Sequence, residues 1–330
     1  MSVTRREFGR VALAAAPAIS ALLRGDLAAA AVAQAQRPMS EWAGVKIGLN
    51  VPYSLGTGNN ISAEDLLARV VEVGFGALEL RAQPVEHFLG SPTIRAAAEA
   101  AKAPNAAPGG RPAAPTAQQK ADIRTWRLSA PSSKLKELRQ MYEKAGVTID
   151  ILKVDDLYTT SDEEVDYFFQ MARDLGARAI SAELPTAPGD TKRIGAFADK
   201  HKVYMAYHHH AQPAAGIYEA AFAEAKYNAA NVDIGHWTAT QNASPLPFIT
   251  KHHDRIPHIH VKDRKLGTNG GENTPFGQGD TAIRPILQAI RDNKWKIRPI
   301  IEFEYKVPEG STRTAEIKKS LDYCRDALMA

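Results

Sequence analysis

The chain has 330 residues, 44% of them hydrophobic, which is enough for one domain with a sizeable buried core. Its formal charge of +4 falls to +2 when the first 35 residues, with four arginines and two acidic side chains, are set aside. So small and evenly mixed a charge argues against nucleic acid as the partner. The one cysteine, Cys324, excludes an internal disulfide and a metal site built from thiolates.

The first segment has the pattern of a twin-arginine export signal. Thr4-Arg5-Arg6-Glu7-Phe8 precedes an apolar run over residues 11–23, and Ala-rich sequence then offers cleavage sites after Ala33 or Ala35. A membrane anchor or an ordinary amphipathic helix is the alternative, but the apolar run is shorter than the ~20 residues that a spanning helix needs. We therefore expect residues 1–35 to direct export to the periplasm or beyond, without a stable membrane anchor.

From residue 46 onward, short apolar runs alternate with longer segments of helical periodicity, which favours a parallel sheet with crossover helices. Predicted strands cover residues 46–51, 77–81, 148–154, 179–184, 203–208, 231–235, 258–262 and 299–305. Predicted helices include residues 63–73, 133–145, 162–175 and 283–292. Eight strand–helix units fit a closed barrel better than an open sheet, so we predict an α/β fold, a single-domain (β/α)8 TIM barrel over residues 36–330.

One segment interrupts this pattern. Residues 96–119 are rich in Ala and Pro, contain Gly109-Gly110 and have no apolar periodicity. We predict a low-complexity insertion after the second strand, outside the packed layers. A lid over the barrel mouth is one role for it, and a disordered surface loop is the role that such a composition favours.

Carboxylates and histidines gather at the predicted strand ends, which in barrel enzymes converge on the active site. Nine of the ten histidines lie between His201 and His260. The strand ends carry, in chain order, Glu79, Lys153, Glu183, His208, His210, Asp233, His236, His260, Glu302 and Glu304. Carboxylate and imidazole ligands together suit Mn, Zn, Co or Fe(II), whereas an all-oxygen set suits Mg or Ca.

Each of these residues alone would have an ordinary explanation. A single acidic residue at a strand end is usually solvated or ion-paired, and a single histidine usually makes a structural hydrogen bond. Here at least four successive strands end in such residues, where β-rich runs would otherwise continue apolar. Burying that many charges without a cation would be costly, so the pattern predicts one divalent metal ion as the cofactor.

Four segments carry a resemblance to a known family: Asp233-Ile-Gly-His236, His258-Ile-His260-Val-Lys262-Asp263, Gly277-Gln-Gly-Asp280 and Ile301-Glu302-Phe-Glu304. In that order they resemble the xylose-isomerase-like barrel superfamily of sugar isomerases and epimerases, which also includes inosose dehydratase. The resemblance spans residue 46 to the C-terminus. It implies that Asp233, His260 and Glu302 are metal ligands.

The resemblance leaves the fourth metal ligand open. Epimerases of the family usually place a Glu at the end of the fifth strand, where this chain has Tyr207-His208-His209-His210. Inosose-dehydratase-like members instead have His-x-His there and a Glu at the end of the fourth strand, a position that Glu183 matches. We therefore expect Glu183 as the fourth ligand, with His208 as the alternative. His209 should point away from its neighbours on an extended strand.

A metal beside a bound sugar can polarise a carbonyl and the adjacent hydroxyl, which favours removal of a neighbouring C–H proton. The expected catalytic residues are His236, His208, His210, Lys153 and Glu302. The expected substrate-binding residues are Glu79, Lys262, Arg264 and Glu304. For the histidines and lysines among them, the alternative role is a hydrogen bond to a metal ligand.

Returning the proton elsewhere gives isomerisation or epimerisation, and expelling a β-substituent gives elimination. We predict a metal-dependent isomerase or epimerase acting on a non-phosphorylated carbohydrate, because sugar phosphates are cytoplasmic and this chain is predicted to be exported. The alternatives are a lyase or dehydratase acting on a keto-sugar, cyclitol or 3-keto-glycoside, and a non-catalytic sugar-binding barrel.

Abasic-site endonucleases share the barrel but need histidines on the early strands, where this chain has Asn50, Glu79 and Lys153. The expected partner is thus a small carbohydrate, not nucleic acid, and assembly into a homo-oligomer is left open.

Overall fold

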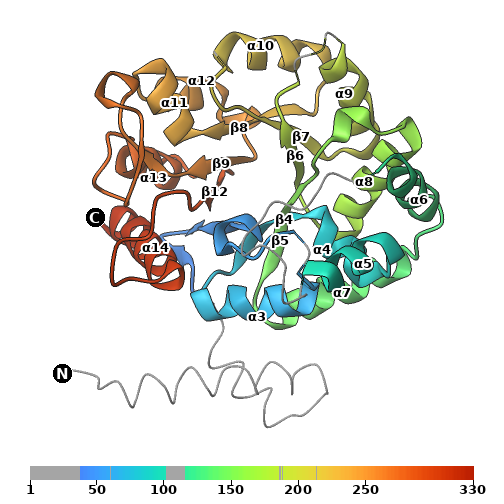
Figure 1. Cartoon of the computed structure of the whole chain (residues 1–330). Helices are drawn as coiled ribbons and strands as arrows, with labels where there is room; N and C mark the ends of the chain where they lie inside the picture. The colour runs from blue at the N-terminus through green and yellow to red at the C-terminus, as the bar shows by residue number, and fades with distance from the viewer. Residues whose placement is uncertain (1–37, 60, 102–115, 186, 188, 213) are drawn as a thin grey trace, which may run out of the picture.

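The computed structural model describes residues 38–59, 61–101, 116–185, 187, 189–212 and 214–330, which form a closed eight-stranded parallel barrel inside a ring of helices (Figure 1). The barrel strands are β3 (Gly48–Val51), β4 (Ala77–Arg81), β5 (Thr148–Lys153), β6 (Ala179–Glu183), β7 (Tyr204–His208), β8 (Asn228–Asp233), β9 (His258–Val261) and β12 (Arg298–Ile301). Each pairs in parallel with the next, and β12 closes the ring against β3. The predicted single-domain (β/α)8 barrel is confirmed.

The helices are α3 (Ala63–Val73), α4 (Ala82–Leu89), α5 (Pro92–Ala101), α6 (Ala117–Arg127), α7 (Ser133–Lys144), α8 (Asp162–Leu175), α9 (Asp190–His201), α10 (Ala214–Glu224), α11 (Ile234–Gln241), α12 (Leu246–His252), α13 (Ile283–Asp292) and α14 (Arg313–Met329). Local sequence explains several ends. Ser62 caps α3 by accepting the Asp65 backbone N–H, and Ser161 caps α8 together with Glu164. The predicted bounds of α3, α8 and α13 are confirmed.

Two strands differ from the prediction at the ends that carry candidate site residues, and most of the others are one or two residues shorter than predicted. β8 stops at Asp233, whose carboxylate caps α11 by accepting the backbone N–H of His236. Ile234 and Gly235, predicted as the end of the strand, therefore lie in a helix. β12 stops at Ile301, so Glu302 and Glu304 lie in the loop that follows it. In both cases the ladder ends where the polar side chains begin.

The predicted insertion over residues 96–119 differs from the structure at both of its ends. Its first residues belong to α5, where Ala98 is buried, and its last residues begin α6, which Thr116 and Gln119 cap. The run of alanines in α5 favours helix, and the capping box of Thr116 and Gln119 starts α6. The remaining residues of the insertion, 102–115, lie outside the described residues, as does the predicted export signal.

Arg127, at the end of α6, anchors the returning chain to the barrel helices. Its Nε donates to Glu86 Oε1 at 2.7 Å, and its Nη1 donates to Glu164 Oε1 at 2.9 Å. The guanidinium also lies 4.6 Å from the centre of the Phe168 ring. Burial raises the pKa of Glu86, while Arg127 acts against that rise, so this carboxylate depends on its partner to stay charged.

Short elements close the two ends of the barrel. At the end where the strands begin, β1 (Glu41–Trp42) and β2 (Val45–Lys46) form a hairpin, and Ser40 Oγ accepts the Gly76 backbone N–H and donates to Ile47 O. At the end where the strands finish lie β10 (Asp263–Arg264), β11 (Asn273–Thr274) and the 3-10 turns η1 (Tyr53–Leu55), η2 (Leu157–Thr159) and η4 (Gly267–Asn269); the turn η3 (His253–Arg255) precedes β9.

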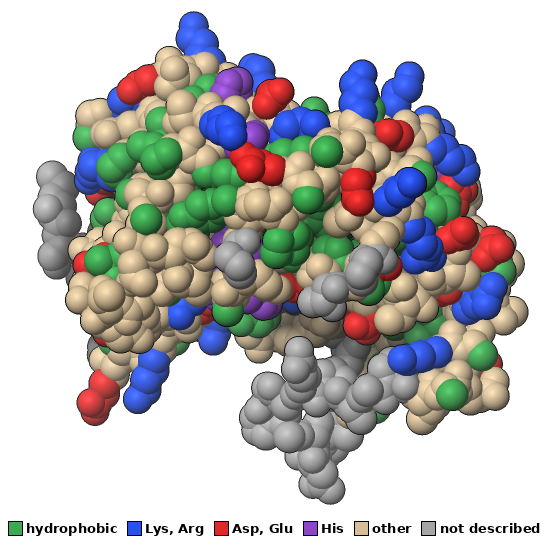
Figure 2. Space-filling model, turned by 90° about the horizontal axis from the view of Figure 1, so that it is seen from above, with side chains coloured by type: hydrophobic (Ala, Val, Ile, Leu, Met, Phe, Trp, Pro, Cys, Tyr) green, Lys and Arg blue, Asp and Glu red, His purple; other side chains and the backbone are tan. Residues whose placement is uncertain are grey.

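The apolar core lies mainly between the strands and the helices. Inside the barrel, a small buried cluster of Ile151, Ala179, Ala206 and Ala229 leaves room for polar side chains above it. Within the described ranges no helix combines the length and the apolar character needed to cross a bilayer. Figure 2 shows Lys and Arg interspersed with Asp and Glu on the face that it views, in keeping with the small net charge.

Candidate active site

Side-chain alternation along three adjacent strands brings candidate ligands to the inside of the barrel mouth. His208, Asp233 and His260 are buried, and the register pairs Asp233 with His260. Glu302 follows β12 directly, and its backbone N–H donates to Val261 O. These four side chains therefore lie at the C-terminal ends of the strands, the position that active sites occupy in such barrels.

The ligand atoms of these residues face one another. His260 Nδ1 lies 3.2 Å from Glu302 Oε2 and 3.7 Å from Asp233 Oδ2. A ring nitrogen of His208 lies within 4.8 Å of carboxylate oxygens of Asp233 and Glu302. Over the residues that the structure describes, His260 Nδ1, Asp233 Oδ2, Glu302 Oε2 and His208 Nδ1 are buried without a hydrogen-bond partner. Buried polar atoms are rarely left unpaired, so this cluster is suited to an ion or a polar ligand.

Neighbouring groups hold the remaining carboxylate oxygens. Asn50 Nδ2 donates to Glu302 Oε1 at 2.9 Å, and the His236 backbone N–H donates to Asp233 Oδ1 at 2.7 Å. Each carboxylate thus has one oxygen fixed by the protein and one facing the cluster. Partners of this kind orient metal ligands in many proteins.

Glu79 holds His260 from below. Its Oε2 lies 2.6 Å from His260 Nε2 and 3.5 Å from His258 Nε2, and all three side chains are fully buried. Although burial opposes the charge, these histidines lower the pKa of Glu79 to about 2. Burial also favours a neutral His260 ring, yet Glu79 and Glu302 raise its pKa well above the usual value. Glu79 was expected to bind substrate, but the structure buries it one layer below the strand ends, against His260.

Lys262 supplies a positive charge beside the cluster. Its Nζ lies 2.6 Å from Glu302 Oε2, 3.1 Å from Asp233 Oδ2 and 2.6 Å from Glu304 Oε2. Burial opposes the charge, but these three carboxylates raise the pKa of Lys262, so it is an ammonium. Together with Glu79, four carboxylates face Lys262 and a protonated His260. The cluster keeps an excess of negative charge, which a divalent cation would balance.

Tyr53 is a member of the site that the sequence analysis missed. Its hydroxyl donates to Glu304 Oε1 at 2.9 Å, and its side chain is 43% exposed at the barrel mouth. Burial and Glu304 together raise the pKa of Tyr53 to about 12, so the hydroxyl stays protonated. The signal in the sequence was an aromatic residue just after the first strand. An exposed ring at this place can pack against the apolar face of a sugar.

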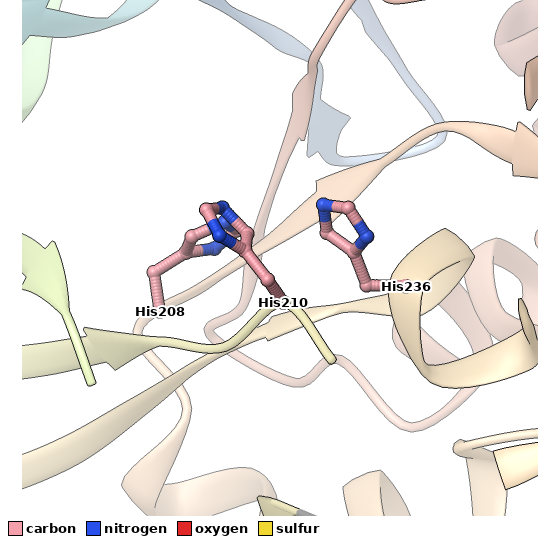
Figure 3. A group of neighbouring side chains, drawn as sticks. All are labelled: His208, His210 and His236. Carbon is pink, nitrogen blue, oxygen red and sulfur yellow. The ribbon is translucent and has the colours of Figure 1, made fainter. Parts of the chain in front are cut away.

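Three histidines come together on one side of the mouth (Figure 3). His208 and His210 come from the end of β7, and His236 faces them from the first turn of α11. His209 points the other way, as alternation predicts, and its Nδ1 lies 2.8 Å from the Tyr218 hydroxyl of α10. His208 and His236 both have lowered pKa values, chiefly because of burial, so both rings are neutral.

Glu183 lies apart from the other three expected ligands. Its Oε1 accepts from Lys153 Nζ at 2.6 Å, and its Oε2 lies 3.4 Å from His210 Nε2. Its side chain is half exposed, whereas Lys153 is buried. In the part of the chain that the structure describes, Glu183 belongs to none of the groups whose ligand atoms lie within 4.8 Å of one another. The geometry brings His208, not Glu183, to Asp233 and Glu302, because Lys153 holds the Glu183 carboxylate.

The donor set fits a single divalent ion. His208, Asp233, His260 and Glu302 offer two imidazole and two carboxylate ligands, a combination that suits Zn, Mn, Co or Fe(II). Two of the ligand atoms, His208 Nδ1 and His260 Nδ1, are buried without a hydrogen-bond partner, which is the structural observation in its favour. His236 is the fourth member of the group in which the ligand atoms of His208, Asp233 and Glu302 lie within 4.8 Å of one another. Its Nε2 is 3.9 Å from Asp233 Oδ2, but its two nitrogens already face the cationic side chains of Lys262 and Arg264.

Comparisons with known proteins agree with the barrel. Residues 229–327, which carry Asp233, His260 and Glu302, match the family model described as "Xylose isomerase-like TIM barrel". No curated protein matches the sequence. Similar solved structures include an uncharacterised protein from Parabacteroides distasonis, with 20% identity over 86% of this chain and 98% of that one and a TM-score of 0.53.

Two further structures are of named enzymes. The 3-keto-D-glucoside 4-epimerase from E. coli is 13% identical over 86% of this chain and 99% of its own, with a TM-score of 0.54. The probable 3-DHS dehydratase from Bacillus anthracis is 13% identical over 84% and 97%, with a TM-score of 0.55. At this identity the likeness concerns the fold alone. The chain therefore has the barrel fold of these enzymes, and its residues 229–327 carry the sequence pattern of the xylose isomerase-like TIM barrel family.

Proposed function

We propose that this protein is an exported member of the xylose isomerase-like family, a metal-dependent isomerase or epimerase that acts on a non-phosphorylated carbohydrate. The observation that carries the proposal is the convergence of ligand atoms from Asp233, His260 and Glu302, with His208 beside them. His208 Nδ1 and His260 Nδ1 have no hydrogen-bond partner, and the facing carboxylate oxygens meet the Lys262 ammonium. A divalent ion bound by these residues would polarise the carbonyl and adjacent hydroxyl of a keto-sugar. The free-sugar substrate follows from the predicted export signal.

Two carboxylates on opposite walls of the barrel support this reaction. Glu302 follows β12 and Glu183 ends β6, and these strands lie four places apart in either direction around the ring. A sugar between them would meet one carboxylate on each face. Glu302 would remove the proton from the carbon beside the carbonyl, and Glu183, once it has taken up a proton from Lys153 or water, would return a proton on the other face. The proton on Glu302 would then pass to solvent, and the stereocentre would be inverted or relocated.

The chain's other polar groups would hold the sugar during this exchange. Lys262 places its ammonium beside Glu302 and Glu304, where it can bind a sugar oxygen that gains negative charge. Tyr53 and Glu304 form the rim at the same side of the mouth. These contacts would keep the carbon skeleton fixed while the proton moves.

A lyase or dehydratase is the second candidate, favoured by one observation. Glu183 contacts both Lys153 and His210 at the mouth, so an amino group and an imidazole, both able to exchange protons, lie beside this carboxylate. Elimination needs such an acid to protonate the leaving hydroxyl or glycoside oxygen. The solved relatives of this fold include both an epimerase and a probable dehydratase, so the fold does not decide between them.

The experiment combines metal analysis with NMR of the substrate. The purified protein is assayed for bound metals, and keto-sugars and 3-keto-glycosides are then incubated with it in deuterated water. The proposal expects a stoichiometric divalent ion and deuterium entering at one carbon without loss of a substituent. Loss of water or of the aglycone would establish the lyase instead. Binding without exchange or elimination would identify a sugar-binding barrel and overturn both enzymatic proposals.

A further inference from the structure

His258 lies inside the barrel, two residues before His260 on β9, and its ring is fully buried. Among the residues that the structure describes, neither nitrogen of this ring has a hydrogen-bond partner. Glu79 Oε2 lies 3.5 Å from His258 Nε2, beyond the usual N–H···O range of about 2.7–3.2 Å. An imidazole has two polar nitrogens in either protonation state, so the buried ring requires partners from outside the described chain.

Two buried oxygens on neighbouring strands also lack partners. Asn50 of β3 and Glu79 of β4 are register partners, and both side chains are buried. Asn50 Nδ2 donates to Glu302, and Glu79 Oε2 accepts from His260. Within the described ranges, the other oxygen of each pair, Asn50 Oδ1 and Glu79 Oε1, is unpartnered. Both oxygens can only accept, so each requires a donor.

The neighbouring interior positions are small or polar. Asn231 of β8 is the register partner of His258, and its Oδ1 is likewise buried without a partner among the described residues. One step nearer the start of the strands, Ala179, Ala206 and Ala229 face the interior. Large branched side chains usually fill this layer of a barrel. Three alanines in their place favour a small polar ligand in the interior.

Water suits these atoms better than a metal ion does. A buried water makes about three hydrogen bonds, and both of its O–H groups can donate. A protein metal site needs three or four ligands. Glu79, His258 and His260 do bring their ligand atoms within 4.8 Å of one another. However, His260 Nε2 already donates to Glu79 Oε2 at 2.6 Å, so this group offers an ion only two free ligands.

We propose that ordered water lies inside the barrel against His258, Glu79 Oε1 and Asn50 Oδ1, and that His258 is a positioning residue for the metal site. Glu79 holds His260, and Asn50 holds Glu302. Water shared by Glu79 and Asn50 therefore joins the supports of two metal ligands, and His258 fixes that water. The positioning role rests on the metal site of the proposed function, whereas the water does not.

The water is tested with crystals of the wild-type protein, grown without added metal and after soaking in Zn²⁺. We expect electron density for water within about 3.2 Å of Glu79 Oε1 and of one His258 nitrogen. This water should be lost or displaced in His258→Phe. An anomalous Zn signal between Glu79 and His258 would overturn the proposal, because a metal would then occupy the site. Direct contact of His258 with Glu79, without density beside either side chain, would overturn it as well.

The positioning role is tested by titrating metal-stripped protein with Zn²⁺ against a chelator. His258→Phe should weaken binding about tenfold, the lower end of the usual effect of such outer partners. His258→Gln keeps a donor and an acceptor, so it should keep most of the wild-type affinity. His201→Phe is the matched control, because His201 is also buried but pairs with Asp166 of α8, and it should bind Zn²⁺ as the wild type does.

Three results would overturn the positioning role: wild-type affinity in His258→Phe, equal losses in His258→Phe and His258→Gln, or the same loss in His201→Phe. Circular dichroism checks that each variant is folded, and His258→Leu replaces His258→Phe if the latter does not fold. A protein that binds no divalent ion would overturn the proposed function and the positioning role together, and the electron density would still decide the water. Zn²⁺ binding without any sugar turnover would contradict the proposed reaction alone.

Discussion

Glu79→Gln tests whether the buried carboxylate prepares His260 for a metal. Compared with a free glutamate side chain, the protein stabilises the charged form of Glu79 over the protonated form by about 3 kcal/mol, since the pKa falls from 4.5 to about 2. Only part of this acts through the 2.6 Å contact with His260 Nε2. Gln keeps an acceptor there but removes the charge that makes the imidazole a stronger donor to metal. We expect metal affinity to fall about 10–100-fold, the usual effect of losing such a partner, or about 1.4–2.8 kcal/mol.

The assay titrates metal-stripped protein with Zn²⁺ or Mn²⁺ against a chelator at several pH values. In the wild type, metal must displace a proton from His260, whose pKa is raised, so affinity weakens as the pH falls. Without the Glu79 charge the pKa of His260 drops, and protons compete less with the metal for its ring. The difference in metal affinity between Glu79→Gln and the wild type should therefore narrow at low pH. Glu86→Gln is the control, because Glu86 is equally buried but pairs with Arg127 of α6 and with none of the cluster residues. The reasoning would be refuted if Glu79→Gln bound metal as tightly as the wild type, or if Glu86→Gln lost as much metal affinity as Glu79→Gln.

Three further predictions follow from single contacts. His208→Ala should lose most of its bound metal by elemental analysis, while Glu183→Ala should keep its metal and lose turnover; the reverse result would make Glu183 the fourth ligand. Tyr53→Ala should raise KM for a sugar about 10-fold, the worth of a lost aromatic contact, while leaving metal content unchanged. Arg127→Met should lower the free energy of unfolding by about 3–5 kcal/mol in urea titrations, because it leaves Glu86 buried and unpaired. That loss should shrink as the pH falls and Glu86 takes up a proton, and a pH-independent loss would contradict the ion-pair explanation.

The fold was predictable because its signals are local. The bounds of α3 and α8 follow from Ser62 and Ser161 as caps and from glycines at the helix ends, and each strand is a short apolar run between such helices. Parallel strands bring their C-terminal ends to one rim, so the approach of Asp233, His260 and Glu302 also followed from the sequence.

The parts that sequence could not give depend on contacts between distant segments. Lys153 of β5 binds Glu183 of the adjacent strand β6, so that His208 and not Glu183 faces the cluster. The local sequence around either residue does not predict this contact. Glu79 lies two residues before the end of β4, so its side chain is buried against His260 instead of facing the mouth, where a substrate ligand was expected. The contact of Arg264 with His236 requires the loop after β9 to fold back over α11.

The hairpin of β1 and β2 has a practical consequence. Ser40 ties the start of the described chain to Ile47 and Gly76, at the end of the barrel where the strands begin. Whatever precedes residue 38, whether an export leader, an affinity tag or a linker to a solid support, is thus joined to the molecule at the pole opposite Asp233 and Glu302. Immobilised through its N-terminus, the protein would turn the end of the barrel that carries Asp233 and Glu302 toward the solution.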